Sequence, residues 1–202
     1  MSTTTREQWL LDCVLALRPD FERVGFPLPE KIRASCSWPS KSALAAKTRR
    51  IGECWSAECS GDASFETFVS PVLTDPIEVS ATLLHELVHS AVGLDAKHKG
   101  PFKTCAKAIG LEGKMTATHA GEELTARLRE ITDTLGPYPH AKLDKSKSNA
   151  PKKQGTRMIL VKCPECEYQV RTTQKWLDVG VPTCPCGAEM VADQPDIDGG
   201  DE

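Results

Sequence analysis

HELVH (residues 85–89) is the stretch from which the rest of the chain can be interpreted, because it places two histidines around a glutamate at helical spacing. Residues four apart on an α-helix lie on the same face, so the imidazoles of His85 and His89 can reach one metal ion together. Glu86 follows the first histidine and is placed to act on a water molecule rather than to bind the metal. The alternative is a pair of ordinary buried histidines beside a satisfied core carboxylate.

The helix around this motif has clear start and stop signals. Asp75 is a good N-cap, Pro76 suits the first helical position, and Glu78 completes a capping-box pattern. Gly93 supplies the C-terminal stop, so we predict a helix from Pro76 to about Val92. Its apolar residues form two stripes, which predicts burial on most sides and histidines inside a cleft. The stripes are Ile77, Ala81, Leu84 and Val88 on one side and Leu83 and Leu87 on another.

Length and composition limit the class of protein. The chain has 202 residues, 40% of them hydrophobic, which suffices for one cored domain and a small module. The net charge of −3 gives no overall basicity for nucleic acid, but the charge is segmented, with a lysine-rich stretch at 141–162 and an acidic one after Gly187. No apolar stretch is long enough to span a membrane. Nine cysteines without a signal peptide favour metal binding in a reducing compartment, so we expect a cytoplasmic protein, or a nucleoid-associated one if it is targeted to DNA.

The elements before the motif predict an α+β order. Thr4 or Thr5 can cap a first helix that runs to Leu17 and ends at Pro19. The inner face of this helix comprises Trp9, Leu10, Cys13, Val14 and Leu17. Three alternating stretches at 31–35, 50–55 and 65–69 predict strands, the last two joined as a hairpin. Three strands that feed one helix indicate an α+β fold rather than βαβ repeats.

Two further helices are predicted after the motif. One runs from Pro101 through Ile109, with Phe102, Cys105, Ala106 and Ile109 packing inward. The other carries Leu124, Leu128, Ile131 and Leu135 at helical intervals and is closed by Gly136-Pro137.

A catalytic zinc typically takes three protein ligands and keeps a fourth position for water. His98 follows His89 by nine residues across a turn, which frees it to approach the metal from another side. Rival third ligands are His119 and His140, and an acidic residue could serve instead in a two-histidine, one-glutamate site. The acidic candidates are Glu112, Glu122 and Glu123.

A second metal site is predicted near the C-terminal end. Two cysteine pairs, Cys163 with Cys166 and Cys184 with Cys186, stand on either side of a seventeen-residue gap. Two such pairs are typical of a four-cysteine zinc ribbon, although the second pair is C-x-C rather than C-x-x-C. So small a module buries little core, so metal binding should supply its folding free energy. The other cysteines are expected to be core or surface residues, namely Cys13, Cys36, Cys54, Cys59 and Cys105.

Together these features resemble the SprT-like family of minimal zinc metallopeptidases, which includes the Spartan-type proteases that act on DNA–protein crosslinks. The likeness rests on three strands, the HELVH motif, a short connection and His98, and it covers roughly Thr5 to Leu135. The family's third ligand commonly lies in an H-G-x-x-F pattern. Here Phe102 keeps its place four residues after His98, whereas the glycine stands at Gly100. The family often carries a C-terminal zinc ribbon as well.

The resemblance implies a minimal zincin-like domain, a three-stranded sheet packed by helices, followed by a small β zinc ribbon. We therefore expect a metallopeptidase domain at 1–139, a basic flexible linker at 140–156, a four-cysteine ribbon at 157–191 and an acidic disordered tail at 192–202.

The expected activity is zinc-dependent hydrolysis of peptide bonds. His85, His89 and His98 would bind a catalytic Zn2+, and Glu86 would accept a proton from water and pass it to the leaving amine. Tyr138 and His119 are both possible oxyanion donors. A second, structural Zn2+ would lie among the four cysteines.

The expected substrate is a protein, and the resemblance implies one bound to DNA, with the linker and the ribbon contacting the DNA. The contacting residues would be Lys152, Lys153, Arg157, Arg171, Lys175 and Trp176. Two plainer interpretations stay open, in which the basic run is a solvated tether and Trp176 packs the ribbon. A competing class is a non-catalytic zinc-binding adaptor that binds nucleic acid or regulates a partner, and a third is a peptidase for one regulatory protein.

Overall fold

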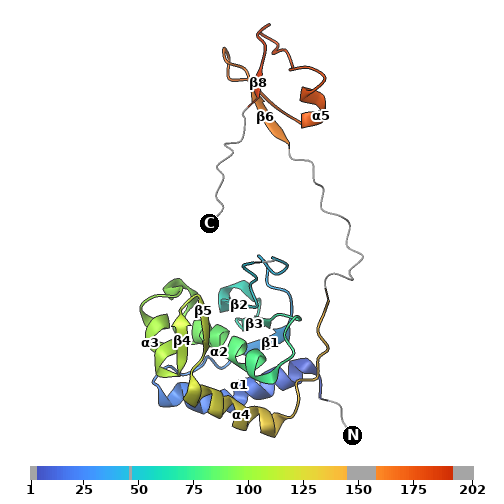
Figure 1. Cartoon of the computed structure of the whole chain (residues 1–202). Coiled ribbons are helices and arrows are strands. Elements are labelled where there is room, and N and C mark those ends of the chain that lie inside the picture. Colours follow the sequence, from blue (N-terminus) through green and yellow to red (C-terminus); the bar gives the residue numbers. More distant parts are fainter. Residues whose placement is uncertain (1–3, 46, 145–157, 193–202) are drawn as a thin grey trace. The chain divides into compact units, whose positions relative to one another are not determined.

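The chain divides into two compact units, Met1–Ser148 and Asn149–Glu202 (Figure 1). The computed structural model describes residues 4–45, 47–144 and 158–192. Helices and small sheets occur together in the first unit, so the predicted α+β class is confirmed. Most of the predicted linker and tail lies outside the described residues, and so do Lys152, Lys153 and Arg157.

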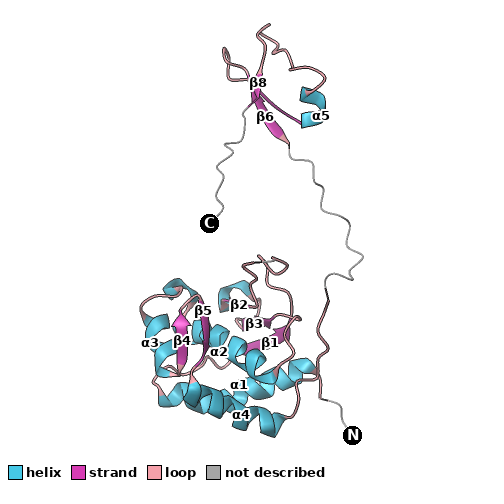
Figure 2. Ribbon diagram, in the orientation of Figure 1, coloured by secondary structure: helices cyan, strands magenta, loops and turns pink. Residues whose placement is uncertain are grey.

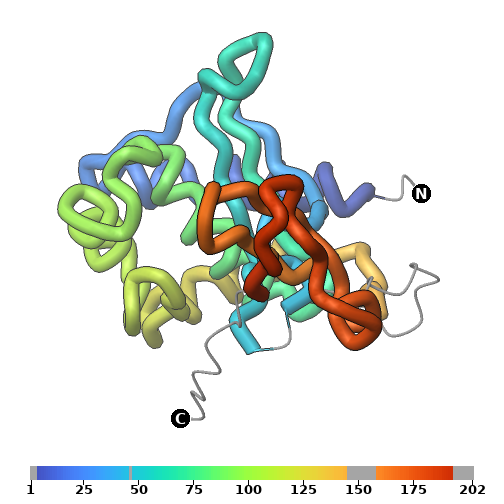
Figure 3. Tube along the Cα trace, turned by 90° about the horizontal axis from the view of Figure 1, so that it is seen from above, coloured from blue at the N-terminus to red at the C-terminus, as the bar shows by residue number. Residues whose placement is uncertain are grey.

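A three-stranded sheet forms one layer of the first unit. Strands β1 (Ile32–Cys36), β2 (Gly52–Trp55) and β3 (Phe65–Val69) confirm the three predicted strands, and the sheet order is β1-β3-β2. Strand β2 pairs antiparallel with β3, so the predicted hairpin is confirmed, whereas β1 pairs parallel with β3. Figure 3 shows β2 and β3 running side by side up to their connecting loop, which includes the short 3₁₀ helix η1 (Ala57–Cys59).

One face of this sheet packs against the motif helix. Because side chains alternate along a strand, the register places Ala34, Thr67 and Cys54 on one face. This face meets the motif helix, where the Cys54 sulfur lies 3.3 Å from the hydroxyl oxygen of Ser90. Glu53, next to Cys54 in β2, has the opposite parity and belongs to the other face.

Helix α1 (Arg6–Arg23) starts as predicted and ends later. The Thr5 hydroxyl accepts a hydrogen bond from the Gln8 backbone N–H, which is the expected N-cap, and the whole predicted inner face is buried. The prediction that Pro19 ends the helix was wrong, because the helix continues for another turn. That turn buries Phe21 completely in the core, and the free energy of this burial offsets the backbone hydrogen bond that proline cannot donate.

Helix α2 (Pro76–Val92) carries the motif and has the predicted bounds. The Asp75 carboxylate accepts the Glu78 backbone N–H at 2.9 Å, and Gly93 follows the last turn with φ +82°. Figure 1 shows α2 between the sheet and helix α4, with α1 beside α4. The helix is therefore buried on most sides, as its two apolar stripes predicted.

The rest of the first unit contains a pair of strands that the sequence did not predict. After the 3₁₀ helix η2 (Leu94–Ala96) come α3 (Pro101–Ala108) and α4 (Glu122–Leu135), which confirm the two predicted helices. Between them lies an antiparallel hairpin of β4 (Leu111–Lys114) and β5 (Ala117–Ala120), drawn as a separate magenta pair in Figure 2. This hairpin contacts His85 of the HELVH motif through Thr118.

The second unit is a small sheet with a short helix. Strands β6 (Ile159–Lys162), β7 (Gln169–Thr172) and β8 (Val191–Ala192) form an antiparallel sheet of order β7-β6-β8, and α5 (Gln174–Leu177) follows β7. Its buried apolar cluster comprises Val161, Cys163, Cys184 and Met190. Within the part of the chain that is described, no helix combines the length and the apolar character needed to cross a membrane.

Candidate metal centres

Three histidines from two elements converge on one point of the first unit. His85 and His89 lie one turn apart on α2, and His98 comes from the connection between η2 and α3. The Nε2 atom of His98 is 3.3 Å from Nε2 of His85 and 3.2 Å from Nε2 of His89. Together they form a group whose ligand atoms all lie within 4.8 Å of one another, so they could hold a metal ion.

The spacing and protonation of these imidazoles both fit a metal ion. Metal–nitrogen bonds of about 2.0–2.1 Å in a tetrahedral site place two nitrogens about 3.3 Å apart. Burial first, and then the charge of His98, lower the pKa of His85 to about 4. Burial and the neighbouring histidines lower the pKa of His89 to about 3. Both rings are therefore neutral at pH 7, which is the form of imidazole that binds metals.

The β4–β5 hairpin orients one of the three rings. Thr118, on β5, places its hydroxyl oxygen 2.7 Å from Nδ1 of His85. When Nε2 faces the centre, Nδ1 carries the proton and donates it to Thr118, which fixes the tautomer that a metal requires. His89 has no such contact, because its Nδ1 is buried with no hydrogen-bond partner among the described residues. Packing must hold His89 in place.

Phe102, on α3, provides that packing. Its ring is fully buried, and its centroid lies 4.4 Å from the ring of His89, 4.9 Å from that of His98 and 5.1 Å from that of His85. All three imidazoles thus contact one aromatic ring. The sequence predicted that Phe102 packs inward but not that it lies against the whole cluster.

A tight turn brings His98 back toward α2. Lys97, with φ +48°, and Gly100, with φ +44°, flank the histidine in backbone conformations that reverse the chain. Lys97 also closes η2 through a hydrogen bond to the carbonyl of Leu94. Positive φ suits Gly100, whereas at Lys97 it carries a steric cost that the surrounding turn must offset.

Glu86 is buried beside the centre, on the side where β2 packs against α2. Burial raises the pKa of Glu86 to about 8, with a smaller lowering by the charge of Arg50. A cation among the histidines would lower this pKa, since positive charge favours the carboxylate. A Cβ atom built on Gly52 would stand 2.5 Å from Oε1 of Glu86 and 2.9 Å from Cγ2 of Thr82. Only glycine at position 52 leaves the Glu86 carboxylate in its present place.

The structure does not bring the rival ligands to this cluster. His119 follows Thr118 on β5, so its side chain projects from the opposite face of the strand, where its Nε2 lies 3.9 Å from a carboxylate oxygen of Glu112. His140 lies 2.9 Å from the carbonyl oxygen of Pro71 through its Nε2. The remaining acidic candidates, Glu122 and Glu123, are exposed at the start of α4.

The two candidate oxyanion donors are also placed elsewhere. His119 is paired with Glu112 as described, and the ring of Tyr138 packs against Trp9 at 5.1 Å and His140 at 5.7 Å. Sequence reasoning missed Thr118 and Gly52, which support the histidines and Glu86 respectively. The alternation of Thr116, Thr118 and Ala120 with other residues was a weak strand signal for the first, whereas nothing local marked the second.

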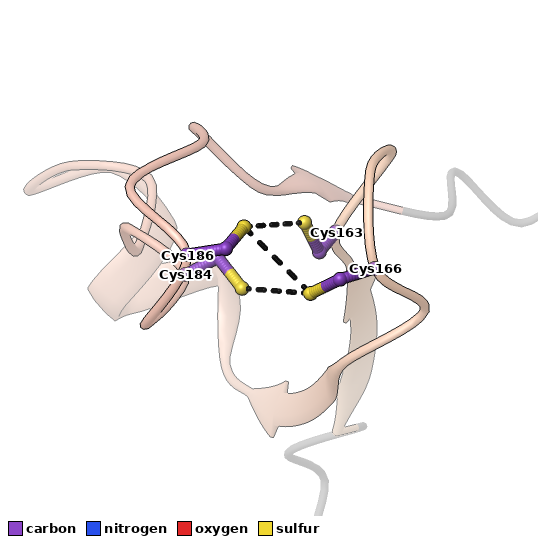
Figure 4. Close-up of side chains that lie close together, drawn as sticks. All are labelled: Cys163, Cys166, Cys184 and Cys186. Carbon is purple, nitrogen blue, oxygen red and sulfur yellow. Dashed lines mark hydrogen bonds between the residues drawn. The ribbon is translucent and has the colours of Figure 1, made fainter.

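Four cysteines form a second cluster in the other unit (Figure 4). The Cys163 sulfur lies 3.5 Å from that of Cys186, and the Cys166 sulfur lies 3.4 Å from that of Cys184 and 3.7 Å from that of Cys186. Sulfurs around a tetrahedral zinc, with bonds of about 2.3 Å, stand about 3.8 Å apart, so these four thiols could also hold a metal ion.

Each cysteine pair lies on a tight turn. In the first, the Glu165 backbone N–H donates to the Cys163 sulfur at 3.4 Å. In the second, the Gly187 N–H donates to the Cys184 carbonyl at 2.8 Å, with Gly187 at φ +95°. This left-handed glycine turn closes the C-x-C pair, which is one residue shorter than the usual spacing.

Three of the residues predicted to contact nucleic acid lie among the described residues of the second unit. Arg171, on β7, and Lys175, on α5, are both exposed. Trp176 is 58% exposed, and the Lys175 ammonium lies 5.1 Å from the centroid of its ring. The interpretation in which Trp176 packs the core of this unit was therefore wrong.

The chain has no significant match among protein-family models, curated proteins or solved structures.

Proposed function

We propose that this protein is a zinc metallopeptidase of the SprT-like type. One observation carries the proposal, namely that three imidazoles converge at metal-ligand spacing beside a buried carboxylate. A structural role for metal explains the three histidines but gives no reason for a buried Glu86 next to them. Metal-dependent peptide hydrolysis uses both a metal ion and a general base close to it.

Zinc bound there would act as a Lewis acid and would make hydroxide available near neutral pH. Glu86 accepts the proton of the attacking water and delivers it to the leaving amine. Its burial excludes bulk water from this transfer, and Gly52 leaves room for its carboxylate. Thr118 and Phe102 keep two of the imidazoles in place during the reaction.

The substrates that we propose are proteins associated with DNA. The four-cysteine unit would be a zinc ribbon with a structural ion, and its exposed Trp176 offers a ring on which a base can stack. Arg171 and Lys175 would contact phosphates. The basic residues before this unit, Lys152, Lys153 and Arg157, would add electrostatic affinity.

Replacing Glu86 by Gln tests the activity. The variant should keep its metal and lose about 10²- to 10⁴-fold in the rate of casein cleavage or self-cleavage, measured with and without single-stranded DNA. Glu78→Gln is a matched control, because this exposed glutamate lies two turns away on the same helix. Cleavage by Glu86→Gln at the parental rate would show that Glu86 is not the base.

Gly52→Ala tests the position of the carboxylate rather than its chemistry. The added methyl group must displace Glu86 or Thr82, so cleavage should fall while metal content stays unchanged. Gly61→Ala is the control, because a Cβ there meets no atom within 4 Å. Equal loss of cleavage in both variants would show that the effect of Gly52→Ala is not local.

Alanine at Lys152, Lys153 and Arg157 tests DNA recruitment. Loss of three phosphate contacts should lower the salt dependence of single-stranded DNA binding by about two units in the slope of log K against log salt. Alanine at Arg23 and Arg129, exposed positions of the first unit, should leave the slope unchanged. If the triple variant also keeps the parental slope, these residues do not contact DNA.

A second function, a non-catalytic zinc-binding adaptor, is favoured by the exposed Trp176 with Lys175 over its ring. Such a surface suits binding and needs no chemistry elsewhere in the chain. The adaptor would bind two metal ions and single-stranded DNA but cleave nothing. Metal-loaded protein that binds DNA and shows equal background cleavage in parent and Glu86→Gln would establish this function.

A further inference from the structure

The outer face of α3 carries a row of lysines next to the three-histidine cluster. Lys103 and Lys107 lie four residues apart on this helix and are both exposed, so they share one face. Lys99 stands four residues before Lys103, at the turn that leads into the helix, and is also exposed. The opposite face of α3 is buried and includes Phe102, whose ring packs against all three imidazoles. One short helix therefore joins this lysine row (Lys99, Lys103 and Lys107) to the candidate metal centre.

The charge of this segment differs from that of the whole chain. Residues 96–111 contain four lysines and neither aspartate nor glutamate, although the chain has a net charge of −3. The ammonium groups of the lysine row form no ion pair or hydrogen bond with any other described residue. Figure 1 shows α3 at the edge of the first unit, beside β4. The row can therefore bind an anion without first breaking an ion pair.

The residue types favour phosphate over an acidic protein surface. Residues 96–111 contain no arginine. Lysine binds phosphate as a point charge, whereas the planar fork of arginine is the better match for a carboxylate. All of α3 is described, and none of its large apolar side chains is exposed. Protein–protein interfaces rely on such apolar anchors and are depleted in lysine, whereas interfaces with nucleic acid are polar and positively charged.

The spacing of the row suits one strand of nucleic acid. Helical residues four apart are separated by about 6 Å along the helix axis, which is comparable with the step between successive phosphates of an extended strand. A single line of positive charge can therefore follow a single phosphate chain. His98, the residue before Lys99, belongs to the three-histidine cluster, so a strand bound along the row passes close to that cluster.

We propose that the lysine row binds the phosphate backbone of a single DNA strand and holds it beside the three-histidine centre. This inference deepens the proposed function, on which the choice of DNA as the phosphate chain rests. DNA would then contact the catalytic unit itself as well as the linker and the ribbon. A protein attached to the bound strand would lie near the metal ion and Glu86, which raises its effective concentration at the centre.

The salt dependence of DNA binding by the full chain tests the row. Anisotropy of a fluorescent oligo-dT strand gives the affinity at several salt concentrations. Replacing Lys99, Lys103 and Lys107 together by Gln should lower the slope of log K against log salt by about two, since each phosphate contact on a single strand contributes about 0.7. A parental slope in this triple variant overturns the proposal, and so does a parent that binds no DNA.

A second triple variant separates local contacts from net charge. Arg23, Lys31 and Arg129 are exposed at other places in the first unit, and their replacement by Gln removes the same charge. This control should keep the parental slope. An equal fall of the slope in both triple variants would show that only the net charge of the protein matters, and it overturns the proposal.

An acidic protein is the rival occupant of the row. NMR spectra of the full chain follow the backbone amide signals of α3 while oligo-dT, or an oligoglutamate with the same number of charges, is added. Shifts of these signals at lower concentrations of oligo-dT than of oligoglutamate support a DNA strand. The reverse order assigns the row to an acidic protein and overturns the proposal.

These measurements need no catalysis, so they also distinguish the row from the proposed activity. A salt slope that depends on the lysine row, in a protein that cleaves no peptide, supports the row and removes the peptidase. Cleavage that depends on Glu86, with a slope that is independent of the lysine row, supports the peptidase and overturns the DNA site on α3.

Discussion

The two candidate metal centres differ in what holds their ligands. The histidines lie on elements of a large core that includes Trp9, Phe21 and Phe102, all fully or almost fully buried. The cysteines lie on two turns in a unit whose described residues include four in the buried apolar cluster, and two of these are Cys163 and Cys184 themselves. Packing therefore determines the histidine geometry, whereas in the second unit the ligands are half of the core.

This difference indicates which of the two units depends on bound metal for its folding. A unit with so little buried apolar area cannot offset the conformational entropy of its chain by packing alone. Bound metal would have to supply the remaining free energy of folding. The first unit has enough core to keep its fold, and its three imidazoles would stay near one another when the metal is removed.

The largest expected effect is therefore the response of the second unit to a chelator. Removing metal from the full chain should unfold the second unit and leave the first folded, because apparent zinc-binding free energies of about 10–16 kcal/mol are typical of such small sites. Trp176 is the only tryptophan of the second unit, so its indole N–H signal in an NMR spectrum reports on that unit alone. The indole signals of Trp9 and Trp55 report on the first.

Replacing Cys163 and Cys166 by Ser controls for effects of the chelator. The variant should bind one metal ion in place of two and lose the dispersion of signals from the second unit. If the signals of both units stay dispersed without metal, the cysteine unit folds by packing, and the proposed dependence on metal is wrong.

Local signals explain how much of this arrangement could be predicted. The cap at Asp75, the stop at Gly93 and the four-residue spacing of His85 and His89 act within one helix, so the sequence predicted α2 with its observed bounds. The same holds for the cap at Thr5. His98 needed only a short turn to reach the cluster, which made it predictable from its distance along the chain.

Contacts between distant residues explain what could not be predicted. Pro19 is a local stop signal, but burial of Phe21 continues α1 beyond it. Thr118 reaches His85 only because a hairpin between α3 and α4 folds over α2, and the pairing of this hairpin was not recognised. The space that Gly52 leaves for Glu86 depends on how β2 packs against α2. Each of these features requires the fold to be known first.

The next largest effect should come from Phe102→Ala, which tests whether packing holds the histidines. Truncating this fully buried ring should destabilise the first unit by about 3–5 kcal/mol in urea unfolding, and the loosened rings should bind metal more weakly. Leu15→Ala on α1 is the control, since that side chain is 60% exposed and should cost less than about 0.5 kcal/mol. Unchanged metal affinity in Phe102→Ala would show that packing does not orient the imidazoles.

A smaller effect is expected from Thr118→Val, which removes one hydroxyl and keeps the shape. Without the Thr118 oxygen, His85 loses the contact that fixes its tautomer, so metal affinity at the three-histidine site should fall about 10- to 100-fold. Competition with a metal-binding dye measures this affinity. Thr134→Val, at an exposed position of α4, should leave it unchanged. An affinity as high as the parent's would assign the geometry of His85 to Phe102 alone.

The smallest expected effect is on the free energy of unfolding of the first unit at acidic pH. Although burial raises the pKa of Glu53, hydrogen bonds from Ser40 and Trp55 and the charge of Arg50 outweigh it, so the net pKa is lowered. A carboxylate with a lowered pKa in the folded state stabilises the fold above its ordinary pKa, near 4.5, and this contribution is lost as pH falls through the lowered value. Glu53→Gln should therefore be less stable than the parent at neutral pH, and the difference should shrink as the pH falls below about 4.5.

Urea unfolding at several pH values measures this difference in stability, and Glu78→Gln is the exposed control. A difference that stays constant with pH would mean that Glu53 stabilises the fold only through neutral hydrogen bonds.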